Sequence, residues 1–146
     1  MSTSTLIADA RAELAALAPE RRCDRLAESS ALFHTAGTVH LLGRGELRFH
    51  LDLAESAVAR RAFAILRALR VESEIRTYQR RSFERGVRTQ LLVDGTDHAI
   101  DVLTEAGVLS RERLPLDRPP GRVVARACCR SAYLRGALLG AGSLSG

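Results

Sequence analysis

The chain carries one short sequence pattern twice, at a constant offset. Residues 23–40 read CDRLAESSALFHTAGTVH, and residues 128–145 read CCRSAYLRGALLGAGSLS. Aligned without gaps, the two copies are identical at the pairs Cys23/Cys128, Arg25/Arg130, Ala27/Ala132, Ala36/Ala141 and Gly37/Gly142. Each copy predicts an apolar helix that ends in a small residue and a glycine. Repetition at a fixed offset is typical of duplicated structural units, and it limits the folds that this chain can adopt.

Length and composition are those of one globular domain. The chain has 146 residues, of which 46% are hydrophobic and 27% charged, so it is long enough to bury a core. All 22 basic residues are arginine, and the formal net charge is +5. Nine arginines lie between Arg60 and Arg88, against Glu72, Glu74 and Glu84. This local positive charge favours anionic partners, nucleic acid first among them; an ordinary solvated surface is the equally compatible alternative.

The cysteine spacing argues against a zinc-binding protein, and the hydropathy argues against a membrane-spanning one. Cys23, Cys128 and Cys129 form no CxxC pair and no cysteine–histidine spacing typical of zinc sites. We therefore expect three reduced thiols that pack as small apolar side chains on a helix face, with no metal and no cofactor. No apolar run approaches the roughly 20 residues of a membrane span. We expect a cytoplasmic protein without membrane contact.

The first half of the chain predicts two helices and a hairpin. Apolar residues at helical spacing predict an N-terminal helix within 1–21, which Pro19 closes. A second helix is predicted from 22 to 36 and ends at Gly37, where a residue without Cβ can take the left-handed conformation. Residues 38–42 and 46–51 flank the turn residues 43–45, which predicts a β-hairpin.

A long helix, a second hairpin and a short helix are predicted next. Asp52 and Glu55 have capping-box spacing before the long helix. The apolar stripe of this helix is Val58, Ala62, Ile65, Leu66 and Leu69, and its other faces carry Arg60, Arg61, Arg67 and Arg70. The second hairpin joins 74–78 to 87–93 through a polar connection at 80–86. Asp97 is predicted to cap a short helix that Gly107 stops.

Residues 110–123 are rich in proline and charge and predict a linker, after which the second copy of the pattern forms a last helix over 124–140. The order between the two pattern helices is helix, two strands, helix, two strands, helix. Two antiparallel hairpins backed by helices predict an α+β fold with a four-stranded antiparallel sheet. One face of the sheet should pack on the helices and the other should stay open.

The second copy of the pattern carries a resemblance to a known family. The segment 134–142, LRGALLGAG, resembles the nine-residue signature of the LAGLIDADG homing endonucleases. In that family two such helices pack side by side between αββαββα lobes. The resemblance implies that small residues line the seam between the two helices: Ala36, Gly37, Gly136, Gly140, Ala141 and Gly142.

A longer match, over 128–143 (CCRSAYLRGALLGAGS), resembles the WhiA family of bacterial sporulation regulators, and the resemblance spans the whole chain. It implies a first LAGLIDADG-like lobe at 22–109, the linker at 110–123, and the start of a second, truncated lobe at 124–146. WhiA proteins are longer and continue into a C-terminal helix-turn-helix domain. By this resemblance the chain is a fragment of a longer protein.

The resemblance also identifies a missing chemistry. In active LAGLIDADG nucleases an acidic residue before the final glycine of each motif holds divalent metal ions at the scissile phosphate. Here those positions are Ala36 and Ala141, and a methyl group cannot bind a metal ion. We expect Asp24 and Glu28 to be surface charges. Asp94, Asp97 and Asp101 are interpreted as turn, cap and helix-surface residues rather than as a metal-binding cluster.

The histidines and Cys23 give only weak indications of a catalytic site. His34, on the apolar stripe of its helix, is expected to be a hydrogen-bonded core histidine. His40 and His50 are expected to lie close together across the first hairpin, without a cysteine or carboxylate placed to complete a triad. Cys23 is expected to be a buried helix residue rather than a nucleophile. No enzyme and no catalytic residue are predicted.

Two functions remain open. By the family resemblance, the first is a nuclease-inactive, nucleoid-associated transcription regulator that binds double-stranded promoter DNA and controls sporulation, cell division and chromosome segregation. Its predicted DNA-contacting residues are Arg60, Arg61, Arg67, Arg76, Tyr78, Arg88 and Gln90. The second is a protein-interaction or scaffold module without DNA contact of its own. Residual nuclease activity through other ligands is the remaining alternative. Exposure of Leu138 or Leu139 on the last helix should favour self-association.

Overall fold

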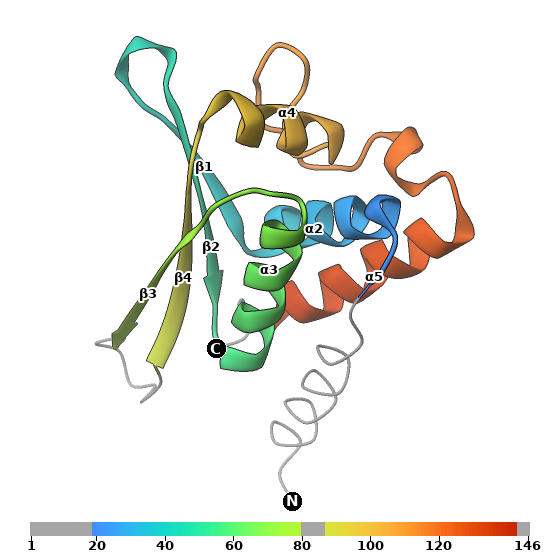
Figure 1. Ribbon diagram of the computed structural model, residues 1–146, viewed down its shortest axis with the longest axis horizontal. Helices are drawn as coiled ribbons and strands as arrows, with labels where there is room; N and C mark the ends of the chain where they lie inside the picture. Colours follow the sequence, from blue (N-terminus) through green and yellow to red (C-terminus); the bar gives the residue numbers. More distant parts are fainter. Residues whose placement is uncertain (1–18, 80–86, 143–146) are drawn as a thin grey trace, which may run out of the picture.

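The computed structural model describes residues 19–79 and 87–142. The helix predicted within 1–21 and the connection at 80–86 therefore lie largely or wholly outside the described residues. The elements, labelled in Figure 1, are α2 (Arg22–Ala36), β1 (Gly37–Leu41), η1 (Gly43–Gly45), β2 (Leu47–Leu53), α3 (Ser56–Ala68), β3 (Glu74–Gln79), β4 (Val87–Asp94), α4 (Asp97–Glu105), η2 (Gly121–Val124) and α5 (Ala127–Ala141).

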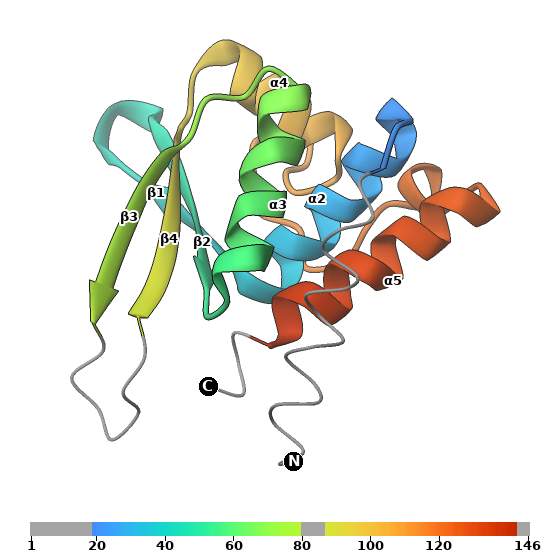
Figure 2. The same cartoon turned by 60° about the horizontal axis from the view of Figure 1, so that its bottom comes forward.

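The strands form one antiparallel sheet in the order β1-β2-β4-β3. The labelled α-helices lie on one side of this sheet, and its other side is open in both ribbon views (Figure 1, Figure 2). The predicted α+β class, the four-stranded antiparallel sheet and the single covered face are confirmed.

The core lies between the sheet and the helices because the strand pattern alternates. In β2, Leu47, Phe49, Leu51 and Leu53 are buried, while the residues between them are not. Successive side chains of a strand point to opposite faces, so these four meet the helices. Phe33 of α2 packs edge-on against Phe49, with ring centroids 6.3 Å apart.

The two pattern helices, α2 and α5, lie side by side and run in the same direction (Figure 2). A Cβ built on Gly136 would collide with the backbone oxygen of Glu28 and would lie 2.9 Å from the Cβ of Ala31. A Cβ on Gly140 would collide with Thr35. The pairs Ala31/Gly136 and Thr35/Gly140 have the same offset as the sequence repeat. The repeated pattern therefore packs against its own copy.

The predicted reason for the glycine at the end of α2 is wrong. Gly37 has φ −101° and ψ 159°, which is extended rather than left-handed. A Cβ at this position would lie 2.6 Å from the backbone oxygen of Phe33, so glycine is needed for close approach of the chain to itself. Gly37 also pairs with Leu51 as the first residue of β1, and the helix passes into the strand without a loop.

Two predicted helix caps are also wrong. Asp52 lies inside β2, and α3 begins after Glu55 without a side-chain cap. At α4 the capping side chain is Thr96, whose hydroxyl accepts a hydrogen bond from the Ala99 amide at 3.2 Å. Gly107, with φ +76°, stops that region as predicted.

The predicted linker at 110–123 is packed against the lobe. Leu109 and Pro115 form an isolated antiparallel bridge, and Val123 is buried. The guanidinium of Arg122 donates to the backbone oxygens of Thr104 and Glu105. These contacts attach the segment before α5 to the end of α4.

Candidate functional site

The uncovered side of the sheet is a polar surface that extends across all four strands. Cross-strand partners share a sheet face, so the register Tyr78↔Arg88 and Arg76↔Gln90 puts all four of these residues on one side. The shared side predicted for them is confirmed. We call this surface the open face; it consists of Thr38, His40, Arg48, His50, Asp52, Glu74, Arg76, Tyr78, Arg88, Gln90, Leu92 and Asp94.

Charges on the open face are paired and balanced. Arg48 Nε lies 3.2 Å from Asp94 Oδ1, and Arg76 Nε lies 3.1 Å from Glu74 Oε1. The third pair joins Arg88 Nε to Asp52 Oδ1 at 3.8 Å. Three arginines against three carboxylates give this surface no formal net charge, with its histidines neutral.

The three pairs differ in exposure. The side chains of Arg48 and Arg76 are 51% and 61% exposed, and those of their partners 78% and 64%. Solvent-exposed ion pairs are worth at most about 1 kcal/mol, so these two arginines can exchange their partners. The Arg88 side chain is only 9% exposed, and it is held inside the sheet surface rather than presented to a ligand.

Asp52 contacts side chains from two other strands on this surface. The hydroxyl of Tyr78 donates to Asp52 Oδ1 at 2.5 Å. This hydrogen bond to Asp52, with partial burial, raises the pKa of Tyr78. Asp52 thus joins β2 to Tyr78 on β3 and to Arg88 on β4.

His40 and His50 are in contact on the open face, as predicted. Their Nε2 and Nδ1 atoms lie 2.6 Å apart, so one ring donates to the other. Burial lowers the pKa of His50, and the neighbouring His40 lowers it further. The lowered pKa favours the uncharged form of His50 at neutral pH.

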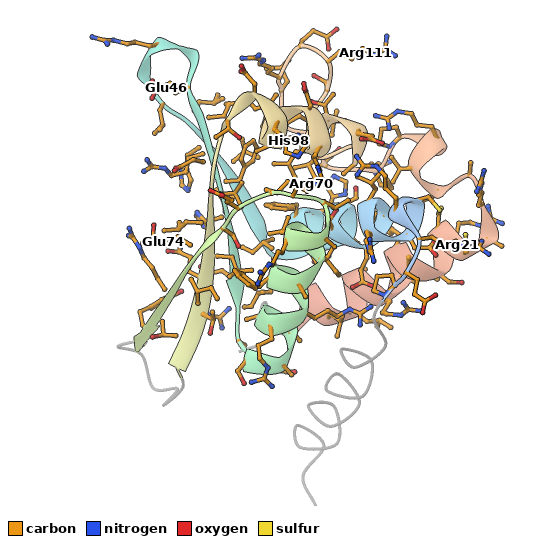
Figure 3. All side chains as sticks on the ribbon, in the orientation of Figure 1. Arg21, Glu46, Arg70, Glu74, His98 and Arg111 are labelled. Atoms are coloured by element: carbon orange, nitrogen blue, oxygen red, sulfur yellow. The ribbon has the colours of Figure 1, made fainter. Side chains whose placement is uncertain are left out.

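The predicted DNA-contacting arginines do not form one surface. Arg60 and Arg67 are exposed on α3, which covers the opposite side of the sheet. Figure 3 shows Arg70 at the end of α3 and Glu74 on β3, where Glu74 points away from the helices. The arginine-rich segment therefore divides between two sides of the lobe.

The surface position expected for Arg61 and Glu28 is wrong. Arg61 donates from Nε to Glu28 Oε2 at 2.5 Å and from a terminal nitrogen to Oε1 at 2.7 Å, and both side chains are buried. Arg135 of α5 lies 3.5 Å from the same carboxylate. Arg61 cannot reach a phosphate from this position. Its fork-like geometry fits the carboxylate, which explains why α3 carries an arginine on its buried side.

The seam residues named from the resemblance fall into two groups. Gly136 and Gly140 lie between α2 and α5, and Ala36 lies beside Gly140. Gly37 contacts its own helix, Gly142 is buried at the end of α5, and Ala141 is exposed. Ala141 therefore does not line the seam in this structure.

His34 is a hydrogen-bonded interior residue, as predicted. Its Nε2 lies 3.1 Å from the Gly107 backbone oxygen and its Nδ1 lies 2.9 Å from the Tyr133 hydroxyl. A carbonyl oxygen only accepts, so Nε2 carries the proton and Nδ1 accepts from Tyr133. Burial lowers the pKa of His34 and raises that of Tyr133.

Sequence reasoning missed a cluster at the other end of the two helices. Four side chains there could bind a metal ion: Cys23, Asp24, Cys128 and Cys129. Their three Sγ atoms and one carboxylate oxygen of Asp24 all lie within 4.8 Å of one another. Burial, reinforced by hydrogen bonds to the neighbouring thiols, raises the pKa of Cys129 to about 12. The signal was present in the repeat, which aligns Cys23 with Cys128.

A family model of the WhiA N-terminal LAGLIDADG-like domain matches residues 22–109. The chain belongs to the WhiA family. Two curated relatives named "Probable cell division protein WhiA" are 32% identical to it: one from Heliobacterium modesticaldum over 94% of this chain and 43% of its own length, and one from Alkaliphilus oremlandii over 92% and 44%. The chain thus spans less than half the length of these WhiA relatives.

Solved WhiA structures have the same fold. The crystal structure of the N-terminal LAGLIDADG domain of DUF199/WhiA matches with a TM-score of 0.64 at 14% identity, over 95% of this chain and 58% of that one. Full-length DUF199/WhiA from Thermatoga maritima matches with a TM-score of 0.61 at 14% identity, over 90% and 37%. Among the described residues, no helix of this WhiA-family chain is long and apolar enough to cross a membrane.

Proposed function

We propose that this chain is the nuclease-inactive, LAGLIDADG-derived part of a DNA-binding transcription regulator, and that its open face lies along double-stranded DNA. The observation that carries the proposal is the open face itself: a polar, four-stranded surface free of covering helices in the described part of the chain. The WhiA relatives are named for cell division. Sporulation and chromosome segregation are the further processes in which we propose that it acts, in a cytoplasmic, nucleoid-associated setting.

Arg48 and Arg76 are the residues through which this face would bind phosphate. Both are exposed, and each is paired with a carboxylate that is itself exposed. Phosphate contacts of this kind position a protein on DNA without reading its sequence. In the longer relatives, sequence recognition would then come from other parts of the protein.

The proposed lack of nuclease activity rests on residue identity at the ends of the motif helices. Ala36 ends α2 and Ala141 ends α5, and neither side chain has an atom that can bind a metal ion. Incubation of supercoiled plasmid with the chain and Mg²⁺ should leave the plasmid intact. Metal-dependent nicking that follows the protein through purification would contradict this.

The DNA contact is tested by fluorescence anisotropy with a duplex over a salt series. Each phosphate contact contributes about −0.9 to the slope of log K against log salt. The double variant Arg48→Ala/Arg76→Ala should bind more weakly and lose about 2 from the magnitude of that slope. The matched control is Arg60→Ala/Arg67→Ala, which removes the same charge from α3 and should bind as the unchanged chain does. If both double variants lost DNA affinity equally, the open face would be rejected as the DNA-contacting surface.

A protein-interaction or scaffold role is the second candidate, and the charge balance of the open face favours it. Three arginines and three carboxylates cancel on this surface, which suits a polar protein partner as well as it suits DNA. Absence of DNA binding at low salt by a well-folded chain would support this second function.

A further inference from the structure

The first turns of α2 and α5 meet at the end of the molecule farthest from the sheet (Figure 1, Figure 2). Cys23 lies in the first turn of α2, and Cys128 and Cys129 lie in the first turn of α5. The sulfur atoms of Cys128 and Cys129 are 4.0 Å apart, and Cys23 Sγ is 3.7 Å from Asp24 Oδ1. Side chains separated by more than 100 residues thus converge on one point.

We propose that Cys23, Cys128 and Cys129, with the carboxylate of Asp24, bind one Zn²⁺ ion that joins the beginnings of α2 and α5. Zinc prefers four ligands in a tetrahedron, with sulfur at about 2.3 Å from the metal, which places neighbouring sulfurs about 3.8 Å apart. The four ligand atoms all lie within 4.8 Å of one another. This spread is close to the separation of ligand atoms around a single tetrahedral zinc ion.

The ligand chemistry selects the metal. Thiolates are soft ligands, which favour zinc over magnesium or calcium. Each thiol that binds loses its proton to the solvent, so the site with three thiolates, one carboxylate and Zn²⁺ carries a formal charge of −2. The positive ends of two helix dipoles meet there, and Arg21 lies 3.9 Å from Cys128 Sγ. Figure 3 shows Arg21 beside the beginning of α2.

The site is accessible and is separate from the motif ends. Cys23 and Cys128 are half-buried, and a pocket of about 300 Å³ lies beside Cys23 and Cys129, between α2 and η2. A metal ion thus has a path to the sulfurs.

The site is also distinct from the positions where LAGLIDADG nucleases hold metal. Those positions, Ala36 and Ala141, are at the opposite ends of the same helices. The proposal is therefore independent of the proposed DNA contact.

The test uses Co²⁺ as the probe, because Zn²⁺ has no visible spectrum. The reduced 146-residue chain is titrated with CoCl₂ under argon, and the complex is then displaced with ZnCl₂. We expect one equivalent of Co²⁺, a sulfur-to-cobalt charge-transfer band and the strong visible bands of a tetrahedral site, all lost on addition of Zn²⁺. Native mass spectrometry should find one Zn²⁺ per chain.

Variants assign the ligands. Cys23→Ser and Cys128→Ser should each weaken Co²⁺ binding by at least about 100-fold, since loss of a mere supporting residue already costs roughly 10- to 100-fold. Asp24→Asn should weaken it less. Asp101→Asn, an exposed change on α4, is the matched control and should bind as the unchanged chain does. Far-UV circular dichroism confirms that each variant is folded.

Three results would overturn the proposal. The first is a folded, reduced chain without a charge-transfer band, and the second is unchanged Co²⁺ affinity in both cysteine variants. The third is a disulfide between Cys23 and Cys128 or Cys129 that forms in air while the reduced chain binds no Co²⁺. That last outcome would assign the cluster to thiol redox chemistry instead.

Discussion

Glu28 is the buried carboxylate on which three helices converge. It belongs to α2, accepts two hydrogen bonds from Arg61 of α3, and lies 3.5 Å from a guanidinium nitrogen of Arg135 of α5. Both members of the Glu28–Arg61 pair are removed from water. Breaking a buried pair costs far more than the pair contributes by itself, because the remaining charge is left without a partner.

We predict that Glu28→Ala destabilises the lobe by about 3–5 kcal/mol, the cost of an uncompensated buried charge. Glu74→Ala removes an equivalent partner from exposed Arg76 and should cost less than about 1 kcal/mol. Urea unfolding followed by circular dichroism measures both. Similar losses in the two variants would show that the Glu28–Arg61 pair is hydrated in solution.

His34 should make stability depend on pH. Burial lowers its folded-state pKa below the 6.5 of the free side chain, so the unfolded chain binds more protons in mild acid. The stability that neutral His34 provides is present above about pH 6.5 and falls as the pH drops through that value towards the folded pKa.

The measurement is the free energy of unfolding of the chain and of His34→Gln at pH 8 and pH 5.5. The variant should lose less stability between these two values, although His50, whose pKa is also lowered, keeps a dependence of the same sign. An identical loss in the two proteins would mean that His34 is not held neutral by the fold.

Between the elements, the seam of α2 and α5 restricts substitution because the two helices approach each other closely. A side chain at Gly136 meets the backbone oxygen of Glu28, which cannot rotate away, and the Cβ of Ala31. The helices must separate to admit it. Separation would also pull Arg135 away from Glu28, so the seam and the buried charges depend on each other.

Gly136→Val should therefore destabilise the lobe by about 1–3 kcal/mol, the usual cost of overpacking, although valine forms helix better than glycine does. Gly121→Ala is the control, because its Cβ would meet nothing within 4 Å. Thermal unfolding compares the two. A Gly136→Val chain as stable as the control would show that α5 is not held against α2 in solution.

Most elements could be predicted because their signals are local. The period-2 pattern of β2 and the apolar stripe of α3 follow directly from which face each residue buries. The helix caps could not be predicted in this way, although Asp52 and Asp97 both have side chains that can cap a helix. The backbone places Asp52 inside β2, and Thr96 rather than Asp97 caps α4. Cap choice depends on where the turn before the helix places its amide groups.

The candidate site was less predictable for a different reason. Strand alternation correctly placed Arg76, Tyr78, Arg88 and Gln90 on one sheet face. The helical spacing of α3, in contrast, wrongly assigned Arg61 to solvent. Arg61 is buried because Glu28, 33 positions earlier, is buried opposite it. Whether two such residues meet depends on how their helices cross. The sequence around each residue alone does not indicate that it will be buried and paired.

At the scale of the whole molecule, the outer side of α5 exposes two leucines among the described residues. Leu134 and Leu138, one turn apart, are 64% and 58% exposed, whereas Leu139 is buried. Exposure of Leu138 agrees with expectation. The chain spans 43% of the length of the Heliobacterium relative.

We predict that the chain self-associates through these two leucines, since exposed apolar ridges favour association. Sedimentation velocity should show a concentration-dependent dimer that Leu134→Glu/Leu138→Glu converts to a monomer. Leu114→Glu, which changes an equally exposed leucine outside α5, should leave the dimer in place. A monomeric chain at the highest attainable concentration would contradict the prediction.

The direct passage of α2 into β1 has a mechanical consequence. Gly37 closes the helix and already pairs with Leu51 in the sheet, so no flexible residue separates the seam from the edge of the open face. A rotation of α2 against α5 would therefore also move β1, the edge strand of the sheet. A ligand that holds α2 and α5 together at one end would thereby also restrict the movement of β1.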